Sequence, residues 1–163
     1  MHRSQAAVLP DEPIPDTRAG ELEGVAAGCD ATVLIAASSG AMVEAVARRI
    51  HGASCRATAP FIRTWAGALP ADPLMLRGIC SDLIHAASRG SLLLADVEHM
   101  PPGIQDSFID LLVELQGAQG PSAAAAVRLL AGTSIALYPR AVAGTFSERL
   151  FYQLNVIHLV VED

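Results

Sequence analysis

Short apolar runs and stretches with helical periodicity alternate along the chain from residue 31 onward. Near-continuous apolar runs are typical of parallel strands buried on both faces, and they predict five strands, at 32–36, 60–65, 91–95, 127–131 and 156–161. Apolar residues at helical spacing predict four helices between or after them, at 41–51, 79–87, 104–116 and 147–154. Strands joined by helical crossovers form a parallel sheet with helices on both faces. The pattern therefore predicts an α/β fold, a three-layer α/β/α sandwich with a five-stranded, mostly parallel sheet.

The first strand, the turn after it and the following helix span residues 31–51 and have the layout of a phosphate-binding loop. In such a loop, backbone N–H groups and a helix N-terminus hold an anion. A Gly-x-x-x-x-Gly-Lys loop here would have glycine at positions 37 and 42 and lysine at 43, but the chain has Ala37, Met42 and Val43. The scaffold of a nucleotide site is thus predicted without its functional residues.

Ligands of parallel sheets bind at the carboxyl ends of the strands, which here are the segments 37–43, 96–100 and 132–135. Three small residues of the first segment offer N–H or hydroxyl donors at the start of the helix: Ser38, Ser39 and Gly40. An anion site and a simple tight turn are both compatible with these residues.

Residues 1–30 are polar and contain prolines at 10, 13 and 15, so we predict a flexible or loosely packed N-terminal segment with one short helix at 21–27. Residues 31–163 are predicted to form one α/β domain. Hydrophobic residues make up 52% of the chain and charged residues 17%, which is typical of a globular protein. No apolar run is long enough to cross a membrane, and the N-terminus has no long apolar segment, so we expect a cytoplasmic protein.

The net charge of −6 argues against nucleic acid or an anionic membrane as a partner through bulk electrostatics. All eleven basic residues are arginines, so no lysine of this chain can reach a phosphate. The cysteines are an odd, scattered set without a C-x-x-C motif, which indicates reduced thiols rather than a disulfide framework or a zinc site: Cys29, Cys55 and Cys80. None of them shows the basic partner pattern of a catalytic nucleophile.

The segment from Asp96 through Glu98 to His99 gathers side chains that bind metals. If the strand alternation continued, the two carboxylates would share one side. Without a second histidine or a cysteine at ligand spacing, we interpret the segment as a solvated loop and predict no metal site. His51 is expected to end a helix, where its charge would suit the macrodipole. His158 is expected to be a hydrogen-bonded core or edge residue of a strand.

Several short motifs occur in the order, and nearly at the spacing, of a known family. They are Val33-Leu-Ile with Val46-Ala-Arg-Arg-Ile-His51, Ser54-Cys-Arg56 with Pro60-Phe-Ile62 and Ala68-Leu-Pro70, Gly90-Ser-Leu-Leu-Leu94 with Met100-Pro101 and Gln105, and Phe146-Ser-Glu-Arg-Leu-Phe-Tyr-Gln-Leu-Asn-Val156. Through them the chain, over residues 31–161, resembles the central AAA+ domain of bacterial enhancer-binding proteins, the NtrC-like activators of sigma-54 RNA polymerase. The resemblance implies an AAA+ P-loop-type core.

The same resemblance implies that the positions serving ATP hydrolysis are replaced. They are Ala37, Met42 and Val43 in Walker A, Ala95 and Asp96 in Walker B, Ser134 at the sensor, and Ser147 and Gln153 at the trans-acting arginines. Arg149 lies near the last two but replaces an acidic family position. The family's sigma-54 contact loop has no room between Pro70 and Gly90, and the helical lid subdomain and DNA-binding helix-turn-helix are expected to be lacking.

Phosphoryl transfer depends on a lysine, magnesium carboxylates and an arginine finger, so the resemblance implies a pseudo-ATPase with no catalytic residues, no metal and no cofactor. We expect a protein-interaction or regulatory scaffold linked to transcription regulation or signalling. Its partner would be a second copy or an intact AAA+ regulator, without direct DNA or membrane binding. One alternative is a nucleotide- or anion-binding switch without hydrolysis, and another is a chain with no selected function. Trp65, at a small polar family position, either fills space or exposes an interaction surface.

Overall fold

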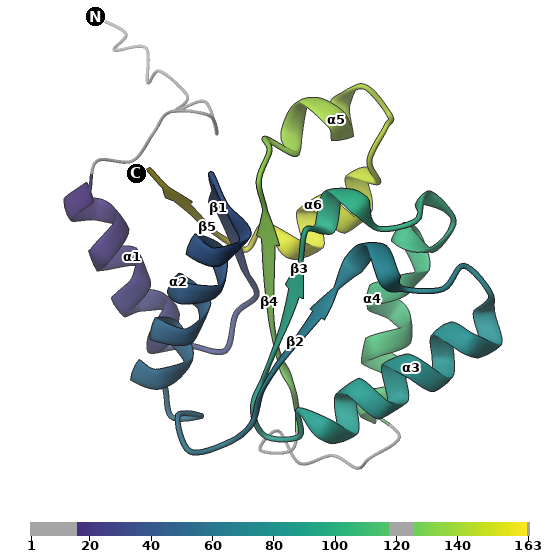
Figure 1. The fold of residues 1–163 in the computed structure, drawn as a ribbon, viewed down its shortest axis with the longest axis horizontal. Coiled ribbons are helices and arrows are strands. Elements are labelled where there is room, and N and C mark those ends of the chain that lie inside the picture. Colours follow the sequence, from purple (N-terminus) through teal and green to yellow (C-terminus); the bar gives the residue numbers. More distant parts are fainter. Residues whose placement is uncertain (1–15, 118–125, 163) are drawn as a thin grey trace, which may run out of the picture.

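A computed structural model describes residues 16–117 and 126–162, and it shows one sheet of five parallel strands in the order β2-β3-β4-β1-β5 (Figure 1). The strands are β1 (Val33–Ala37), β2 (Phe61–Trp65), β3 (Ser91–Ala95), β4 (Arg128–Thr133) and β5 (Ile157–Val161). The helices are α1 (Asp16–Ala27), α2 (Gly40–Ala53), α3 (Pro73–Ala86), α4 (Pro102–Gly117), α5 (Tyr138–Val142) and α6 (Glu148–Leu154). Two 3-10 turns, η1 (Ala66–Ala68) and η2 (Val97–His99), follow β2 and β3. The predicted α/β sheet is confirmed, and every pairing within it is parallel.

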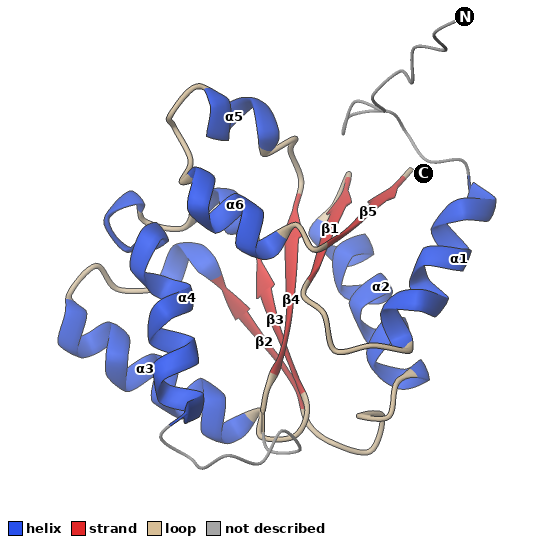
Figure 2. Ribbon diagram, turned by 180° about the vertical axis from the view of Figure 1, so that it is seen from behind, coloured by secondary structure: helices blue, strands red, loops and turns tan. Residues whose placement is uncertain are grey.

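The helices form one layer on each face of the sheet, as Figures 1 and 2 show. Helices α1 and α2 cover one face, to which the strands contribute Val33, Ile35, Leu93, Leu130 and Leu159. Helices α3 to α6 cover the other face, to which the strands contribute Leu34, Leu94 and Ala131. Consecutive strand side chains point to opposite faces, so strands covered on both sides need apolar residues at every position. This requirement explains why the sequence shows runs rather than alternation.

Helices α3 and α5 differ from the sequence prediction. Helix α3 begins at Pro73 rather than at residue 79, because the Asp72 carboxylate accepts a hydrogen bond of 2.9 Å from the N–H of Met75 and proline fits the first helical turn. Helix α5 was not predicted at all, since its five residues are too few for a periodic pattern. The stretch 117–122 is rich in Gly, Pro and Gln, from which the sequence predicts a linker loop, and it falls mostly in 118–125, outside the described residues.

Helix α1 is longer than the predicted helix and lies against the core. Ala26 is buried, Leu22 packs on the α2 face of the sheet, and Glu23 forms an ion pair of 2.9 Å with Arg49 of α2. Residues 1–15 lie outside the described part, and the domain boundary at residue 30 stays a prediction. No helix within 16–117 or 126–162 combines the length and apolar character needed to cross a membrane.

His51 lies in the last turn of α2, as predicted, but both of its ring nitrogens are engaged in hydrogen bonds. Its Nε2 lies 3.0 Å from the carbonyl of Ala59 and its Nδ1 lies 2.9 Å from the Ser91 hydroxyl. A carbonyl only accepts hydrogen bonds, so Nε2 carries the proton and Nδ1 accepts from Ser91. Burial lowers the pKa of His51, and this outweighs the hydrogen bond to Ala59, which acts in the opposite direction. His51 is therefore a neutral bridge between α2 and the start of β3.

Candidate functional site

The turn after β1 is closed by Ser39, which caps helix α2. The Ser39 hydroxyl accepts a hydrogen bond of 3.3 Å from the N–H of Met42, and the Ser39 carbonyl accepts one of 3.1 Å from Val43. Ala37 is buried and pairs with Val161 of β5. Two N–H groups at the start of α2 are thus already used by the turn itself, as in an ordinary N-capped helix.

Met42 and Val43 belong to the hydrophobic core. Val43 is 3% exposed, and a Cβ added to Gly132 of β4 would lie 2.3 Å from Val43 Cγ1. The isopropyl group of Val43 therefore occupies the space that a side chain at position 132 would need. Met42 packs against the edge of the same cluster. Position 43, where a Gly-x-x-x-x-Gly-Lys loop would have its lysine, is consequently part of an apolar contact between α2 and β4.

The end of β3 turns away from the strand direction at Asp96. Ala95 is buried, whereas Asp96 has a left-handed backbone, with φ of 52° and ψ of 57°, and its carbonyl accepts a hydrogen bond of 3.0 Å from His99. The strand alternation that would have put Asp96 and Glu98 on one side does not continue, because a 3-10 turn begins here, within the segment predicted to be a loop. Within the described residues, no group of three or more His, Cys, Asp or Glu side chains is arranged to hold a metal ion.

Glu98 connects the end of β3 to the end of β4. Its Oε1 accepts hydrogen bonds of 2.7 Å from the Ser134 hydroxyl and 3.1 Å from the Ser134 N–H. Burial raises the pKa of Glu98, but the hydrogen bonds from Ser134 and neighbouring groups outweigh it and hold the pKa below its ordinary value. Oε2 is buried and has no hydrogen-bond partner within the described part of the chain. The sequence does not reveal this pair, since Glu98 and Ser134 are far apart in the chain.

Ser147 caps helix α6 and fastens it to α4. Its hydroxyl accepts a hydrogen bond of 3.1 Å from Leu150 and donates to Asp106, and its N–H donates to Gln105 at 2.8 Å. Arg149 forms an ion pair of 2.7 Å with Asp110. These groups bind one another across the contact between α4 and α6. The Arg149 guanidinium, which is close to the positions 147 and 153 where the resemblance implies arginines, is therefore paired with the Asp110 carboxylate.

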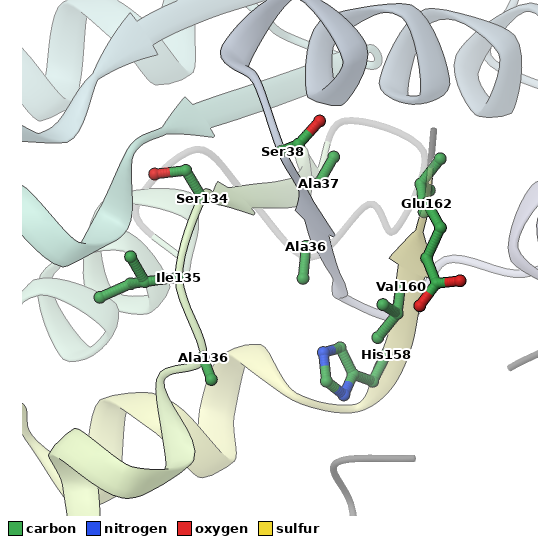
Figure 3. A pocket seen from close by; sticks show the side chains of 10 residues that line it. Ala36, Ala37, Ser38, Ser134, Ile135, Ala136, His158, Val160 and Glu162 are labelled. Atoms are coloured by element: carbon green, nitrogen blue, oxygen red, sulfur yellow. The ribbon is translucent and has the colours of Figure 1, made fainter. Parts of the chain in front are cut away.

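A cavity of about 270 Å³ opens at the carboxyl ends of β1, β4 and β5 (Figure 3). Its wall is largely apolar, and His158 projects toward it from β5, which places that histidine at the edge of the sheet rather than deep in the core. Ser38 and Ser134 both border it, although the Ser134 hydroxyl is engaged by Glu98. The structure thus brings the predicted segments 37–43, 96–100 and 132–135 together at one edge of the sheet.

Trp65 ends the edge strand β2 and is 46% exposed. Its indole ring lies 6.2 Å from the ring of His99, centre to centre. The sequence left two alternatives for Trp65, that it fills space or that it is exposed at the surface. Because nearly half of this residue is exposed, the structure favours the second.

Comparison with known proteins gives consistent matches over most of the chain. The family described as the sigma-54 interaction domain matches residues 80–160. The regulatory protein AtoC of Escherichia coli is 34% identical over 149 residues, covering 80% of this chain and 32% of AtoC. NtrX from Brucella abortus in complex with ADP superposes with a TM-score of 0.70 at 28% identity, over 90% of this chain and 36% of NtrX. The P-loop NTPase domain of a sigma-54 transport activator from E. coli has the same fold, with a TM-score of 0.64 at 18% identity, over 90% of this chain and 94% of that domain. The chain spans about a third of the length of the first curated relatives it matches.

Proposed function

Since the chain belongs to the sigma-54 interaction domain family of AAA+ proteins, we propose that it is a catalytically inactive member of that family. In this proposal it acts in the cytoplasm as a protein-interaction module in transcription regulation. The observation that carries the proposal is the burial of Val43 against Gly132, at the position where the family has its phosphate-binding lysine. Phosphoryl transfer relies on positioned charges, and losing one of them costs on the order of 10³-fold in rate.

Four more family positions support this proposal through the residues that now occupy them. Ser134, at the sensor position, binds Glu98, and Ser147, at an arginine position, caps α6. Ala95, at the first Walker B carboxylate, is buried and carries no charge. Asp96 keeps one carboxylate, but its left-handed backbone leads into η2 rather than continuing the strand.

A hydrolysis assay with magnesium and millimolar ATP tests the proposal directly. The wild-type protein should release no phosphate above the blank, and Asp96→Asn should give the same trace. Trace contamination by another ATPase would appear equally in both preparations. Magnesium-dependent hydrolysis that disappears in Asp96→Asn would overturn the proposal.

The proposed partner is a second copy of the chain or an intact AAA+ regulator, and the surface of α5 and α6 supports a protein contact. Exposed apolar side chains gather on these two helices and just beyond them: Tyr138, Val142, Tyr152 and Val156. Exposed tyrosines with neighbouring aliphatic residues are characteristic of protein interfaces.

Mixing the protein with an intact family ATPase tests the contact. We expect co-elution on size exclusion and a changed hydrolysis rate of the intact enzyme. Tyr152→Ser should weaken both effects. Val25→Ser is a matched control, because Val25 and Tyr152 are each 59% exposed and Val25 lies on α1, across the sheet. Equal loss in both variants, or no effect of the wild-type protein, would argue against this surface.

A nucleotide- or anion-binding switch without hydrolysis is the second candidate, and the cavity beside Ser38 favours it. Thermal-shift titration separates the two functions, since a switch should gain several degrees in Tm at millimolar ATP or ADP while a scaffold should not. Stabilisation by nucleotide without phosphate release would identify the switch.

A further inference from the structure

Strand β2 is the outer strand at one edge of the sheet, and its outward side has no partner strand among the described residues (Figure 2). The strand at the other edge, β5, packs against α1, whereas β3 is the one element that β2 contacts extensively in the described part of the chain. Edge strands carry a row of unpaired N–H and C=O groups, which are able to pair with a further strand. The outward side of β2 therefore offers main-chain groups to an extended segment.

One hydrogen bond, of 3.0 Å from the Ser91 N–H to the Pro60 carbonyl, fixes which groups of β2 point outward. The main-chain groups of successive residues point to opposite sides of a strand, and Phe61 is paired in register with Ser91 of β3. Residues 62 and 64, like the Pro60 carbonyl, therefore direct their main-chain groups toward β3. The N–H and C=O groups of Phe61 and Arg63, and the N–H of Trp65, point away from the sheet.

The side chains of these outward residues follow the strand alternation onto the α2 face, where Phe61 packs against the core. The Arg63 side chain is 43% exposed and lies 3.3 Å from the Glu44 carboxylate of α2, and Arg48 lies 2.9 Å from the same carboxylate. The Arg48 guanidinium also lies over the Phe61 ring, 4.5 Å from its centre. Two guanidiniums thus share one carboxylate, so this side of the edge keeps a surplus positive charge in a chain whose net charge is −6.

Trp65 provides a fixed aromatic surface at the end of the same edge. A Cβ added to Gly67 would lie 2.7 Å from Trp65 Cζ2, so the indole ring occupies the space that a side chain at position 67 would need. The ring of His99 borders the indole, and nearly half of Trp65 remains exposed. An aromatic side chain that is already held in place loses little freedom on binding, which is characteristic of interface anchors.

We propose that the free edge of β2 binds an extended, acidic segment of a partner protein as an additional strand. Main-chain hydrogen bonds to Phe61, Arg63 and Trp65 hold the segment. A carboxylate of the segment lies opposite Arg63 and pairs with its guanidinium, while apolar side chains lie against Phe61 and Trp65. On the other face of the strand, the segment packs against Ile62 and Thr64.

The charge at this edge argues against a second copy of the chain as the occupant. Two copies paired antiparallel about a two-fold axis at Arg63 would place their guanidiniums opposite each other, and like charges directly opposite are destabilising. The strand site lies on a different surface from that of α5 and α6, and it does not depend on whether the chain hydrolyses ATP.

Trp65 is the one tryptophan of the chain, so its fluorescence reports on this edge without a label. The probe is a short synthetic peptide of alternating valine and threonine with glutamate at its centre, and a second peptide has lysine in place of glutamate. Titrated into the full chain, the glutamate peptide should shift Trp65 emission to shorter wavelength and bind about tenfold more tightly than the lysine peptide. Equal affinities, or no shift with either peptide, would overturn the proposal.

Charge reversal at Arg63 tests the pairing from the side of the protein. Arg63→Glu should reverse the preference, so that the lysine peptide binds more tightly. Arg77→Glu is the matched control, because the Arg77 side chain is 49% exposed, is paired with the single carboxylate of Glu114 and belongs to the opposite helical layer. Both affinities should stay as in the wild type in this control, and an equal change in the two variants would count against a site at β2.

Main-chain pairing is tested on the peptide, which leaves the fold of the protein untouched. N-methylation of every second residue removes the N–H groups on one side of the extended peptide, and methylation of the intervening residues removes those on the other side. One of the two methylated peptides should keep its affinity and the other should lose it. Equal effects of the two would mean contact without strand pairing, and a Trp65 emission that shifts with protein concentration alone would mean that a second copy occupies the edge. Either result would refute the proposed strand site.

Discussion

Adding one methyl group at Gly132 should destabilise the fold, and shortening Val43 should remove most of that effect. A Cβ at position 132 would lie 2.3 Å from Val43 Cγ1 and 3.4 Å from Val43 Cβ. Valine in a helix has one strongly preferred rotamer, so Val43 cannot turn away without strain. The clash must then be relieved by a shift of α2 away from β4, which disturbs the core between them.

The size of the effect follows from packing and backbone terms of opposite sign. Overpacking a core costs about 1–3 kcal/mol, while replacing a glycine in a strand gains about 0.5–1 kcal/mol. Gly132→Ala should therefore lower the free energy of unfolding by up to about 2.5 kcal/mol. Val43→Ala removes two buried methyl groups and should cost about 1.5–3 kcal/mol. In the double variant the new methyl group enters the vacated space, so the loss should fall below the sum by about 1–2 kcal/mol.

Urea unfolding, followed by circular dichroism, measures the free energy of unfolding of the wild type, the two single variants and the double variant. Gly40→Ala is the control, because position 40 begins α2 and a Cβ there would have no heavy atom within 4 Å. Its free energy of unfolding should change by about 0.5 kcal/mol or less. If the Gly132 and Val43 effects add within about 0.5 kcal/mol, the two residues do not share the space. That result would refute the assignment of the lysine position to the core.

Further predictions concern the other replaced positions and the buried histidine. Ser134→Ala removes a donor to a half-buried carboxylate and should lower the free energy of unfolding in urea by about 1–3 kcal/mol. The pKa of Glu98 is held below its ordinary value in the folded chain, so its stabilisation is present above pH 4.5 and is lost as the pH falls through the folded pKa; Glu98→Gln should flatten this part of a pH series. The pKa of His51 is also lowered, here by burial of a base, so the unfolded chain takes up the proton first and the Tm should fall as the pH drops below 6.5 in the wild type but not in His51→Gln. Ser147→Ala should cost about 0.5–2 kcal/mol in unfolding through the lost cap, whereas Ser81→Ala on the exposed side of α3 should leave stability unchanged.

The strand framework could be predicted because burial on both faces leaves a direct trace in the sequence. The runs at Val33–Ala37 and Ser91–Ala95 are apolar at nearly every position, and each is an interior strand of the sheet. The start of α3 was not predicted because prolines and glycines punctuate residues 66–78 and interrupt the helical pattern, although Asp72 before Pro73 is a cap signal in its own right. A five-residue helix such as α5 leaves no periodic trace.

The candidate site was predictable only as far as its chain segments were concerned. Parallel strands place their carboxyl ends together, so the meeting of the first, third and fourth strands followed from topology. The side-chain contacts within the site could not be predicted from topology, because each joins residues distant in the chain: Val43 contacts Gly132, and Glu98 binds Ser134. Ser147 before Glu148 could have been recognised locally as a helix cap.

Under the proposal of an inactive family member, the contacts made at the replaced positions distinguish conversion of a site from simple loss. Random replacement of polar residues at a former ligand site tends to leave buried groups without partners, which is costly. At three of the replaced positions the side chain has instead a specific neighbour. Ser134 binds the Glu98 carboxylate, Ser147 caps the N–H of Leu150, and Val43 packs against the space that Gly132 leaves without a side chain. Gln153 differs, since its Oε1 is buried without a hydrogen-bond partner in the described chain, as is Oδ1 of Asn155. Because both oxygens are buried, a protein docked on the surface of α6 cannot donate to them, and Gln153 remains, among the positions named here, one at which the fold has not gained a polar neighbour within the described chain.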